Sequence, residues 1–209
     1  MRRTSALPVC MAVALFVTGC AKEAPSNDVS GPAPTSTAVR TLMDVTTGLE
    51  VTSGQVGTFN HAGQSFVVTE SGSFQGLRFN FYSYKKEPVA FGSLYLLTQE
   101  YLGLPGGLSA STPGFVARSE SSAGGVYTFA TTAVITGGTK YWVYTDTQGS
   151  FAGSFDTDIF AGGDMYVSGI ASAPFRKAQA SGRMVNGVFV PAPAGVFVDA
   201  NFKLQARPR

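Results

Sequence analysis

The clearest constraint on the fold is an alternating run near the end of the chain. Between residues 196 and 205, one set of apolar side chains alternates residue by residue with a second, largely polar set. The apolar set is Val196, Val198, Ala200, Phe202 and Leu204. A period of two puts the two sets on opposite faces of a β-strand. A shorter run with the same period covers residues 77–81.

Further segments have the alternation and the aromatic content of strands, and glycine-rich turns separate them. The predicted strands are 64–69, 91–99, 125–130, 139–145, 165–168 and 186–190. The predicted turns are 70–72, 105–107, 137–138, 162–164 and 194–195. Glycine is abundant, at 25 residues, and only 13% of residues are charged, which favours strands over surface helices. We therefore expect an all-β domain over 40–209, a two-sheet antiparallel β-sandwich of jelly-roll type, with a closed barrel as the alternative.

The first 20 residues have the order of an export signal. Arg2 and Arg3 precede an apolar stretch over 6–17, which is too short to span a membrane. The stretch ends in Val17-Thr18-Gly19-Cys20, which resembles the lipobox of bacterial lipoproteins. The resemblance implies a signal peptide over 1–19 and a diacylglycerol on Cys20, with a further acyl chain such as palmitate on its amino group. A plain secretory signal, in which Cys20 is incidental, is the alternative.

Lipidation would place the domain in the cell envelope. Several acyl chains on Cys20 would give stable membrane anchoring. Ala21 follows the cysteine in place of the Asp that retains lipoproteins in the inner membrane, so we expect the outer membrane in a Gram-negative host. Cys10 would leave with the signal, so the mature chain would have no disulfide. Residues 20–39, which are rich in Pro, Ser and Ala, are expected to form a flexible linker.

The order of several short motifs resembles the choice-of-anchor type domains of exported bacterial proteins. These motifs are Gln64-Ser65-Phe66, 76–79, 104–108, 137–143, 161–166 and 199–204. The resemblance covers about residues 55–207 and implies a β-sandwich at the cell surface, with no chemistry attached. The chain ends near the domain without a C-terminal anchor, and we expect the lipid on Cys20 to take that place.

Catalysis and nucleic-acid binding both lack support in the sequence. The chain has 15 basic and 13 acidic residues, and loss of Arg2 and Arg3 leaves 13 of each, without a basic cluster. His61 is the only histidine, expected in a loop before a strand, and there is no Gly-x-Ser-x-Gly motif and no zinc ligand set. Carboxylates at Glu120, Asp146, Asp156 and Asp158 could form a glycosidase pair only by folding together. We predict that the protein is not an enzyme.

Calcium is the cofactor that the carboxylate residues of the sequence suggest. Asp156, Asp158 and Asp164 lie in one segment with Gly162 and Gly163, and turn carboxylates can bind Ca²⁺. The spacing is not that of an EF-hand. The alternative, that these side chains only solvate and cap a loop, is favoured.

Aromatic residues supply the remaining functional hypothesis. In 141–144, Trp142 and Tyr144 share one strand face, and Tyr141 and Val143 share the other. If the first face is exposed, it forms a flat surface on which sugar rings could stack. If it is buried, Trp142 is a core residue, which is the favoured interpretation. Polysaccharide is the first candidate ligand of this binding or presentation domain, and an assembly role with another envelope protein is the alternative.

Overall fold

The computed structural model describes residues 37–46, 53–55, 60–83, 85–154, 158–180 and 182–209. Residues 35–209 form one compact unit, separate from residues 1–34. Within the described residues the structure is strands and loops with two short 3₁₀ turns, η1 (Pro105–Gly107) and η2 (Ala123–Gly125). No helix in that part of the chain is long and apolar enough to span a membrane.

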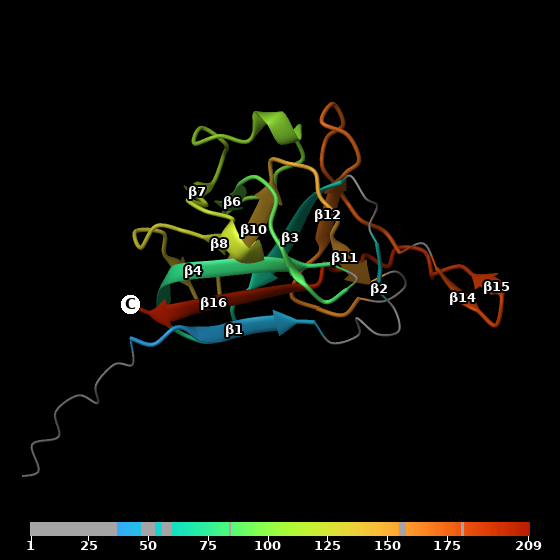
Figure 1. The fold of residues 1–209 in the computed structure, drawn as a ribbon, viewed down its shortest axis with the longest axis horizontal. Helices are drawn as coiled ribbons and strands as arrows, with labels where there is room; N and C mark the ends of the chain where they lie inside the picture. Colours follow the sequence, from blue (N-terminus) through green and yellow to red (C-terminus); the bar gives the residue numbers. More distant parts are fainter. Residues whose placement is uncertain (1–36, 47–52, 56–59, 84, 155–157, 181) are drawn as a thin grey trace, which may run out of the picture. The chain divides into compact units, whose positions relative to one another are not determined.

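The first sheet has six strands, all antiparallel to their neighbours (Figure 1). Its order is β1-β16-β4-β5, and β8 and β9 also pair with β4. The strands are β1 (Arg40–Val45), β4 (Ser73–Tyr82), β5 (Pro88–Val89), β8 (Tyr127–Thr128), β9 (Ile135–Thr136) and β16 (Phe202–Pro208). The ten-residue β4 is thus the centre of the sheet, and β1 is an edge strand.

The second sheet also has six antiparallel strands, in the order β13-β12-β3-β10-β6-β7. They are β3 (His61–Val67), β6 (Leu94–Leu97), β7 (Phe115–Arg118), β10 (Lys140–Thr145), β12 (Met165–Ser168) and β13 (Arg176–Lys177). Two small two-stranded sheets complete the fold, one of β2 (Ser53–Gln55) with β11 (Ala152–Ser154), the other of β14 (Arg183–Val185) with β15 (Val188–Val190).

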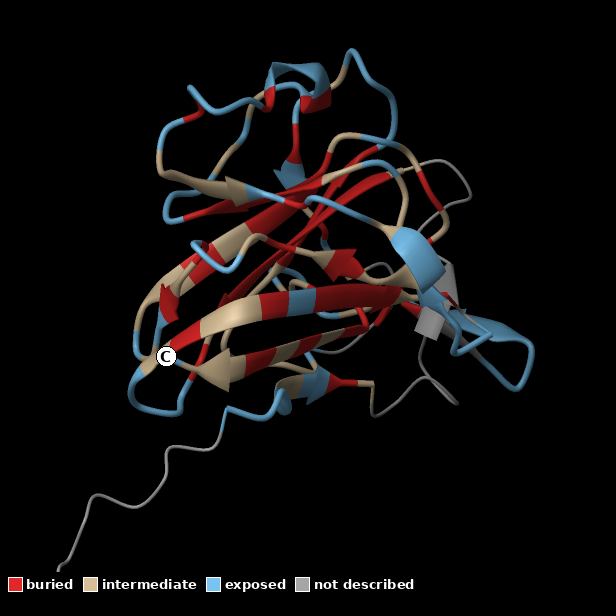
Figure 2. Cartoon of the chain, turned by 60° about the vertical axis from the view of Figure 1, so that its left-hand side comes forward, coloured by how far each residue is buried: buried red, intermediate tan, exposed pale blue. Residues whose placement is uncertain are grey.

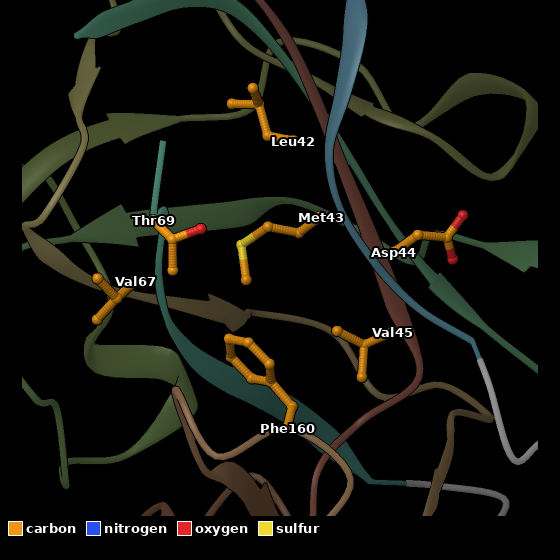
Figure 3. A pocket seen from close by; sticks show the side chains of 7 residues that line it. All are labelled: Leu42, Met43, Asp44, Val45, Val67, Thr69 and Phe160. Carbon is orange, nitrogen blue, oxygen red and sulfur yellow. The ribbon is translucent and has the colours of Figure 1, made fainter. Parts of the chain in front are cut away.

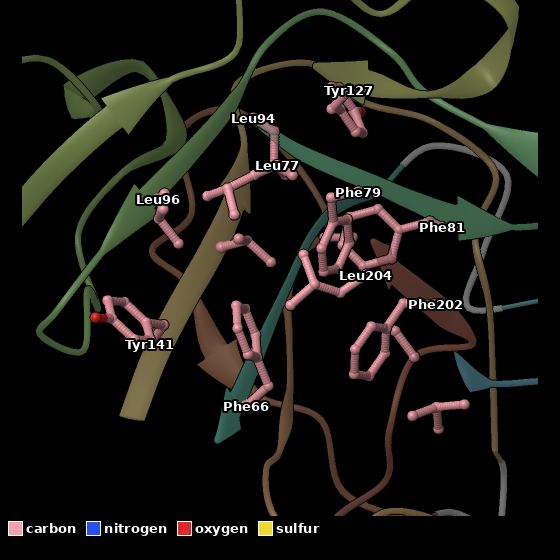
Figure 4. Packing of buried hydrophobic residues seen from close by; sticks show 14 of the residues in the cluster. Phe66, Leu77, Phe79, Phe81, Leu94, Leu96, Tyr127, Tyr141, Phe202 and Leu204 are labelled. Atoms are coloured by element: carbon pink, nitrogen blue, oxygen red, sulfur yellow. The ribbon is translucent and has the colours of Figure 1, made fainter. Parts of the chain in front are cut away.

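The main core lies between the two large sheets (Figure 4). Phe79 and Phe202 come from neighbouring strands of the first sheet, and their rings stack with centroids 5.3 Å apart. Phe66, on the facing second sheet, packs its ring 6.2 Å from Phe79 and 6.0 Å from Tyr141. Figure 2 shows the same alternation of buried and more exposed positions along the strands that the sequence carries. These ring contacts account for the packing of one sheet against the other.

The expected all-β sandwich is confirmed: the two antiparallel sheets are not closed into a barrel. The strand at 165–168 coincides with β12, and the run at 77–81 lies in β4. The strand expected over 139–145 corresponds to β10, which begins one residue later. Other boundaries were wrong. The strand expected over 196–205 is regular only from Phe202 and continues to Pro208. The strand expected over 186–190 begins at Val188, because Asn186 and Gly187 form the turn of the β14–β15 hairpin.

Candidate functional site: the outer face of the second sheet

The outer face of the second sheet carries a row of tyrosines that meet across a glycine. Gly63 on β3 pairs with Tyr144 on one side and with Tyr166 on the other. A β-carbon at Gly63 would come within 2.5 Å of Cδ1 of Tyr144. Because Gly63 has no side chain, the rings of Tyr144 and Tyr166 reach each other above it, with centroids 5.4 Å apart. The glycine thereby creates a continuous aromatic surface over three strands.

Two loops cover most of this aromatic surface. The loop after β6 donates the Tyr101 backbone N–H to the hydroxyl of Tyr144 at 3.0 Å. The loop after β12 brings Phe175 against Tyr144, with ring centroids 4.8 Å apart, and its backbone N–H donates to the carbonyl of Gly103 at 3.0 Å. Tyr144 is therefore fully buried, with 0% of its surface exposed. Burial also raises the pKa of Tyr144 well above its ordinary value.

Trp142 lies at the margin of this covered area and stays partly exposed. Its backbone pairs with Ser65 and Leu97, and its side chain points to the same face as Tyr144. The indole Nε1–H donates to the hydroxyl of Tyr166 at 3.1 Å, and that hydroxyl donates to Oε1 of Glu100 at 2.6 Å. The two bonds fix the rotation of the indole.

The hydrogen-bond chain also sets the protonation of Tyr166. Burial, together with the hydrogen bond to the Glu100 carboxylate, raises the pKa of Tyr166 above its ordinary value. Tyr166 therefore remains a hydroxyl throughout the physiological range and accepts from Trp142 while it donates to Glu100. The Lys140 ammonium lies 5.5 Å from the centre of the Trp142 ring. The indole therefore has one cation over its ring and is linked to the Glu100 carboxylate only through the Tyr166 hydroxyl.

The sequence correctly placed Trp142 and Tyr144 on one face, opposite Tyr141 and Val143. Tyr141 and Val143 belong to the core between the sheets, while Trp142 and Tyr144 belong to the outer cluster. Trp142 is therefore not the central core residue that the sequence interpretation favoured. A ligand at this face would contact Trp142 and not Tyr144, since the loops described above cover the tyrosine. No signal in the sequence marks Glu100 or Tyr166 as neighbours of Trp142.

The three calcium candidates differ in their surroundings. Asp156 lies outside the described residues. Asp164 forms an ion pair with Lys177, with 2.9 Å between Oδ2 and Nζ. Asp158 accepts the backbone N–H of Phe160 at 3.0 Å. Within the described part of the chain, no three His, Cys, Asp or Glu side chains are grouped as a metal site would need.

Asp158 instead adjoins a buried carboxyl group, that of Asp199, which belongs to the largely polar set of the 196–205 alternation. Asp199 is 1% exposed, and its carboxyl accepts from Gln64 Nε2 at 3.0 Å and from the backbone N–H groups of Ile159 and Phe160 at 3.2 and 3.0 Å. Burial raises the pKa of Asp199 to about 7, and the neighbouring Asp158 acts in the same direction, against the hydrogen bond from Gln64. The hydrogen bonds from Ile159 and Phe160 to Asp199 thus hold the 158–160 loop against the sandwich.

His61 is the first residue of β3 and is 3% exposed, so its expected loop position was wrong. Burial lowers the pKa of His61 and favours its neutral form. Its ring lies edge-on to Phe175, at a centroid distance of 6.4 Å. Among the carboxylates considered for glycoside hydrolysis, Asp146 accepts the backbone N–H of Ser93 at 2.8 Å and lies near Arg118. His61 therefore packs against Phe175, and Asp146 binds Ser93 and Arg118, so both side chains have contacts that stabilise the fold.

A small pocket of mixed polar and apolar lining opens beside the edge strand β1 (Figure 3). Met43 points into it between Thr69 and Phe160, and Leu42, Val45, Val67 and Asp44 complete the lining. Its volume of about 190 Å³ is below the range of roughly 300–1,000 Å³ that small-molecule sites occupy. The outer face at Trp142 is therefore the stronger candidate for ligand contact.

The chain was compared with known proteins at three levels. No protein-family model, no curated protein and no solved structure matches it.

Proposed function

We propose that this chain is a non-catalytic, lipid-anchored envelope protein whose β-sandwich binds polysaccharide at Trp142. One observation carries the proposal: the indole is partly exposed on the outer face of the second sheet, in an orientation that Tyr166 fixes by a hydrogen bond. A sugar ring has a weakly polar C–H face and a rim of hydroxyl groups. A flat indole can stack on the C–H face, and the Lys140 ammonium, 5.5 Å from the centre of the ring, can donate to the hydroxyl rim.

The test is direct binding of residues 35–209, the compact unit that contains both hydrophobic clusters, to a panel of envelope and host polysaccharides. We expect Trp142→Ala to lose about tenfold or more in affinity, since it removes the stacking surface. Tyr166→Phe keeps the ring and removes only the hydrogen bond that orients it, so a smaller loss is expected. Val39→Ala, at a residue 46% exposed just before β1 of the other sheet, is the control and should bind like the original domain.

Thermal unfolding of each variant establishes that it is folded. Equal binding by folded Trp142→Ala and by the original domain would reject the site. If the folded original domain binds no glycan on the panel, the polysaccharide proposal fails, and an assembly role with an envelope protein becomes the better hypothesis.

The anchoring part of the proposal rests on the sequence at Cys20, outside the described residues. An alkyne analogue of palmitate, supplied to cells that express the full chain, should label the original protein and not Cys20→Ser. Cys10→Ser is the matched control and should keep the label, because Cys10 lies within the segment expected to be removed. Labelling of Cys20→Ser would refute lipidation at this position, with no bearing on the Trp142 site.

A further inference from the structure

A two-stranded arm extends from the second sheet (Figure 1). The arm starts at β13 and ends in the hairpin of β14 and β15. Between these two points, the backbone N–H of Ala180 donates to the carbonyl of Val196 at 2.9 Å and joins the two strands of the arm. Asn186 and Gly187 form the two-residue turn with φ of 50° and 80°, values that suit a type I′ turn. Figure 1 shows β14 and β15 running away from both large sheets.

The end of the arm exposes apolar side chains that no element in the described part of the chain covers. Val185, Val188, Phe189 and Val190 are 38%, 64%, 56% and 45% exposed. Figure 2 shows the tip of the arm as exposed. Val185 and Val188 are a cross-strand pair and share one face of the ribbon with Val190, whereas Phe189 lies on the other face. The four residues together expose on the order of 300 Å², so the tip presents apolar side chains on both of its faces. A two-stranded hairpin with uncovered side chains is marginally stable alone, so a surface that covers it would stabilise it.

The charge of this region restricts what can cover it. From Met165 to Val198 the sequence contains no Asp or Glu, but it contains Arg176, Lys177 and Arg183. Asp164, just before the stretch, pairs with Lys177. Arg176 is exposed. In a chain with nearly equal numbers of acidic and basic residues, this apolar tip therefore stands in a locally cationic segment.

A second copy of the chain fits these observations poorly. Pairing two arms would bring like charges together, which opposes association. The apolar area of one tip is also well below the roughly 800 Å² per partner that a stable interface buries. A bilayer with acidic headgroups fits better, because its negative surface attracts the cationic segment and its interior accepts a few apolar side chains without a large interface.

We propose that the tip of the arm inserts Val188, Phe189 and their neighbours into the interfacial layer of an anionic membrane, to which the cationic segment around the arm is attracted. Insertion is shallow, because the outer edges of a two-stranded ribbon carry backbone N–H and C=O groups that must stay hydrated. The arm and Trp142 are separate features, so this proposal stands or falls independently of polysaccharide binding. The arm would orient the domain on the membrane, in addition to any tether at Cys20.

The experiment is flotation of residues 35–209 with vesicles of phosphatidylcholine alone or with one quarter phosphatidylglycerol. This unit lacks Cys20, so a lipid anchor cannot contribute. We expect flotation with the anionic vesicles, less with the neutral ones, and a decrease at high salt. Phe189→Ser should lower vesicle partitioning about tenfold. Ile170→Ser, at a residue 59% exposed on the loop after β12, is the matched control and should leave partitioning unchanged.

A second readout measures insertion. In Phe189→Trp, anionic vesicles should shift the fluorescence emission to the blue and brominated lipids should quench it, whereas the original domain, with Trp142 alone, should show neither change. The proposal is overturned if the folded original domain does not float, if Phe189→Ser floats equally well, or if emission at position 189 is unaffected by vesicles. It is also overturned if sedimentation reveals a dimer that Phe189→Ser dissociates, which would assign the tip to a protein interface.

Discussion

Raising the pH should destabilise this domain through Asp199. The carboxyl group is 1% exposed, and its pKa is raised from 3.8 to about 7 by burial, with Asp158 acting in the same direction. The native state therefore holds a proton that the unfolded chain releases near pH 4. The stabilising contribution is fully present below about pH 4 and is lost as the pH rises through about 7. The difference between a pKa of 3.8 in the unfolded chain and about 7 in the native state corresponds to roughly 4 kcal/mol of unfolding free energy.

The assay is urea unfolding of residues 35–209 between pH 4 and pH 8, with Asp199→Asn as the test variant. The asparagine cannot titrate, so its unfolding free energy should lack the decline between pH 4 and pH 8 that the original domain shows. Its absolute stability will be lower, because its NH₂ group must face either Gln64 Nε2 or the backbone N–H groups of Ile159 and Phe160. The difference in slope between the two proteins is the readout, since titrating groups other than Asp199 and its neighbour Asp158 contribute equally to both.

Asp158→Asn is an independent check of the same reasoning. Removing the neighbouring carboxyl group takes away one cause of the raised pKa of Asp199, so the decline should be smaller and should shift to lower pH. Parallel pH profiles for the original domain and Asp199→Asn would refute the assignment of the buried proton to Asp199.

Two substitutions test the packing of the two clusters by urea unfolding. Gly63→Ala should destabilise the domain by about 1–3 kcal/mol, because its β-carbon would overlap the ring of Tyr144, whereas Gly106→Ala, where a β-carbon meets nothing within 4 Å, should be close to neutral. Phe202→Ala removes a buried ring that stacks on Phe79 and should cost about 3–5 kcal/mol. A loss below about 1 kcal/mol at Phe202 would show that the core is not packed as described.

The period of two predicted the long strands because it reports a purely local property, the alternation of side chains across a pleated backbone. It failed for the two-residue strands such as β5 and β9, which are too short to show a period and exist because β4 offers a partner. It also failed at Asp199. Alternation placed this residue in the largely polar set, yet it is buried, because the 158–160 loop lies over it and donates two backbone N–H groups to its carboxyl.

The sequence by itself determined the all-β class, the strand at 165–168, and the shared face of Trp142 and Tyr144, because these depend on neighbours along the chain. Only the tertiary structure decided which face of β10 meets the other sheet, and that Tyr144 is covered while Trp142 stays partly exposed. Both faces of that strand carry aromatic residues, so its periodicity is the same in either orientation. Loops from distant parts of the chain, after β6 and after β12, make the distinction, and their packing is not encoded in the local pattern.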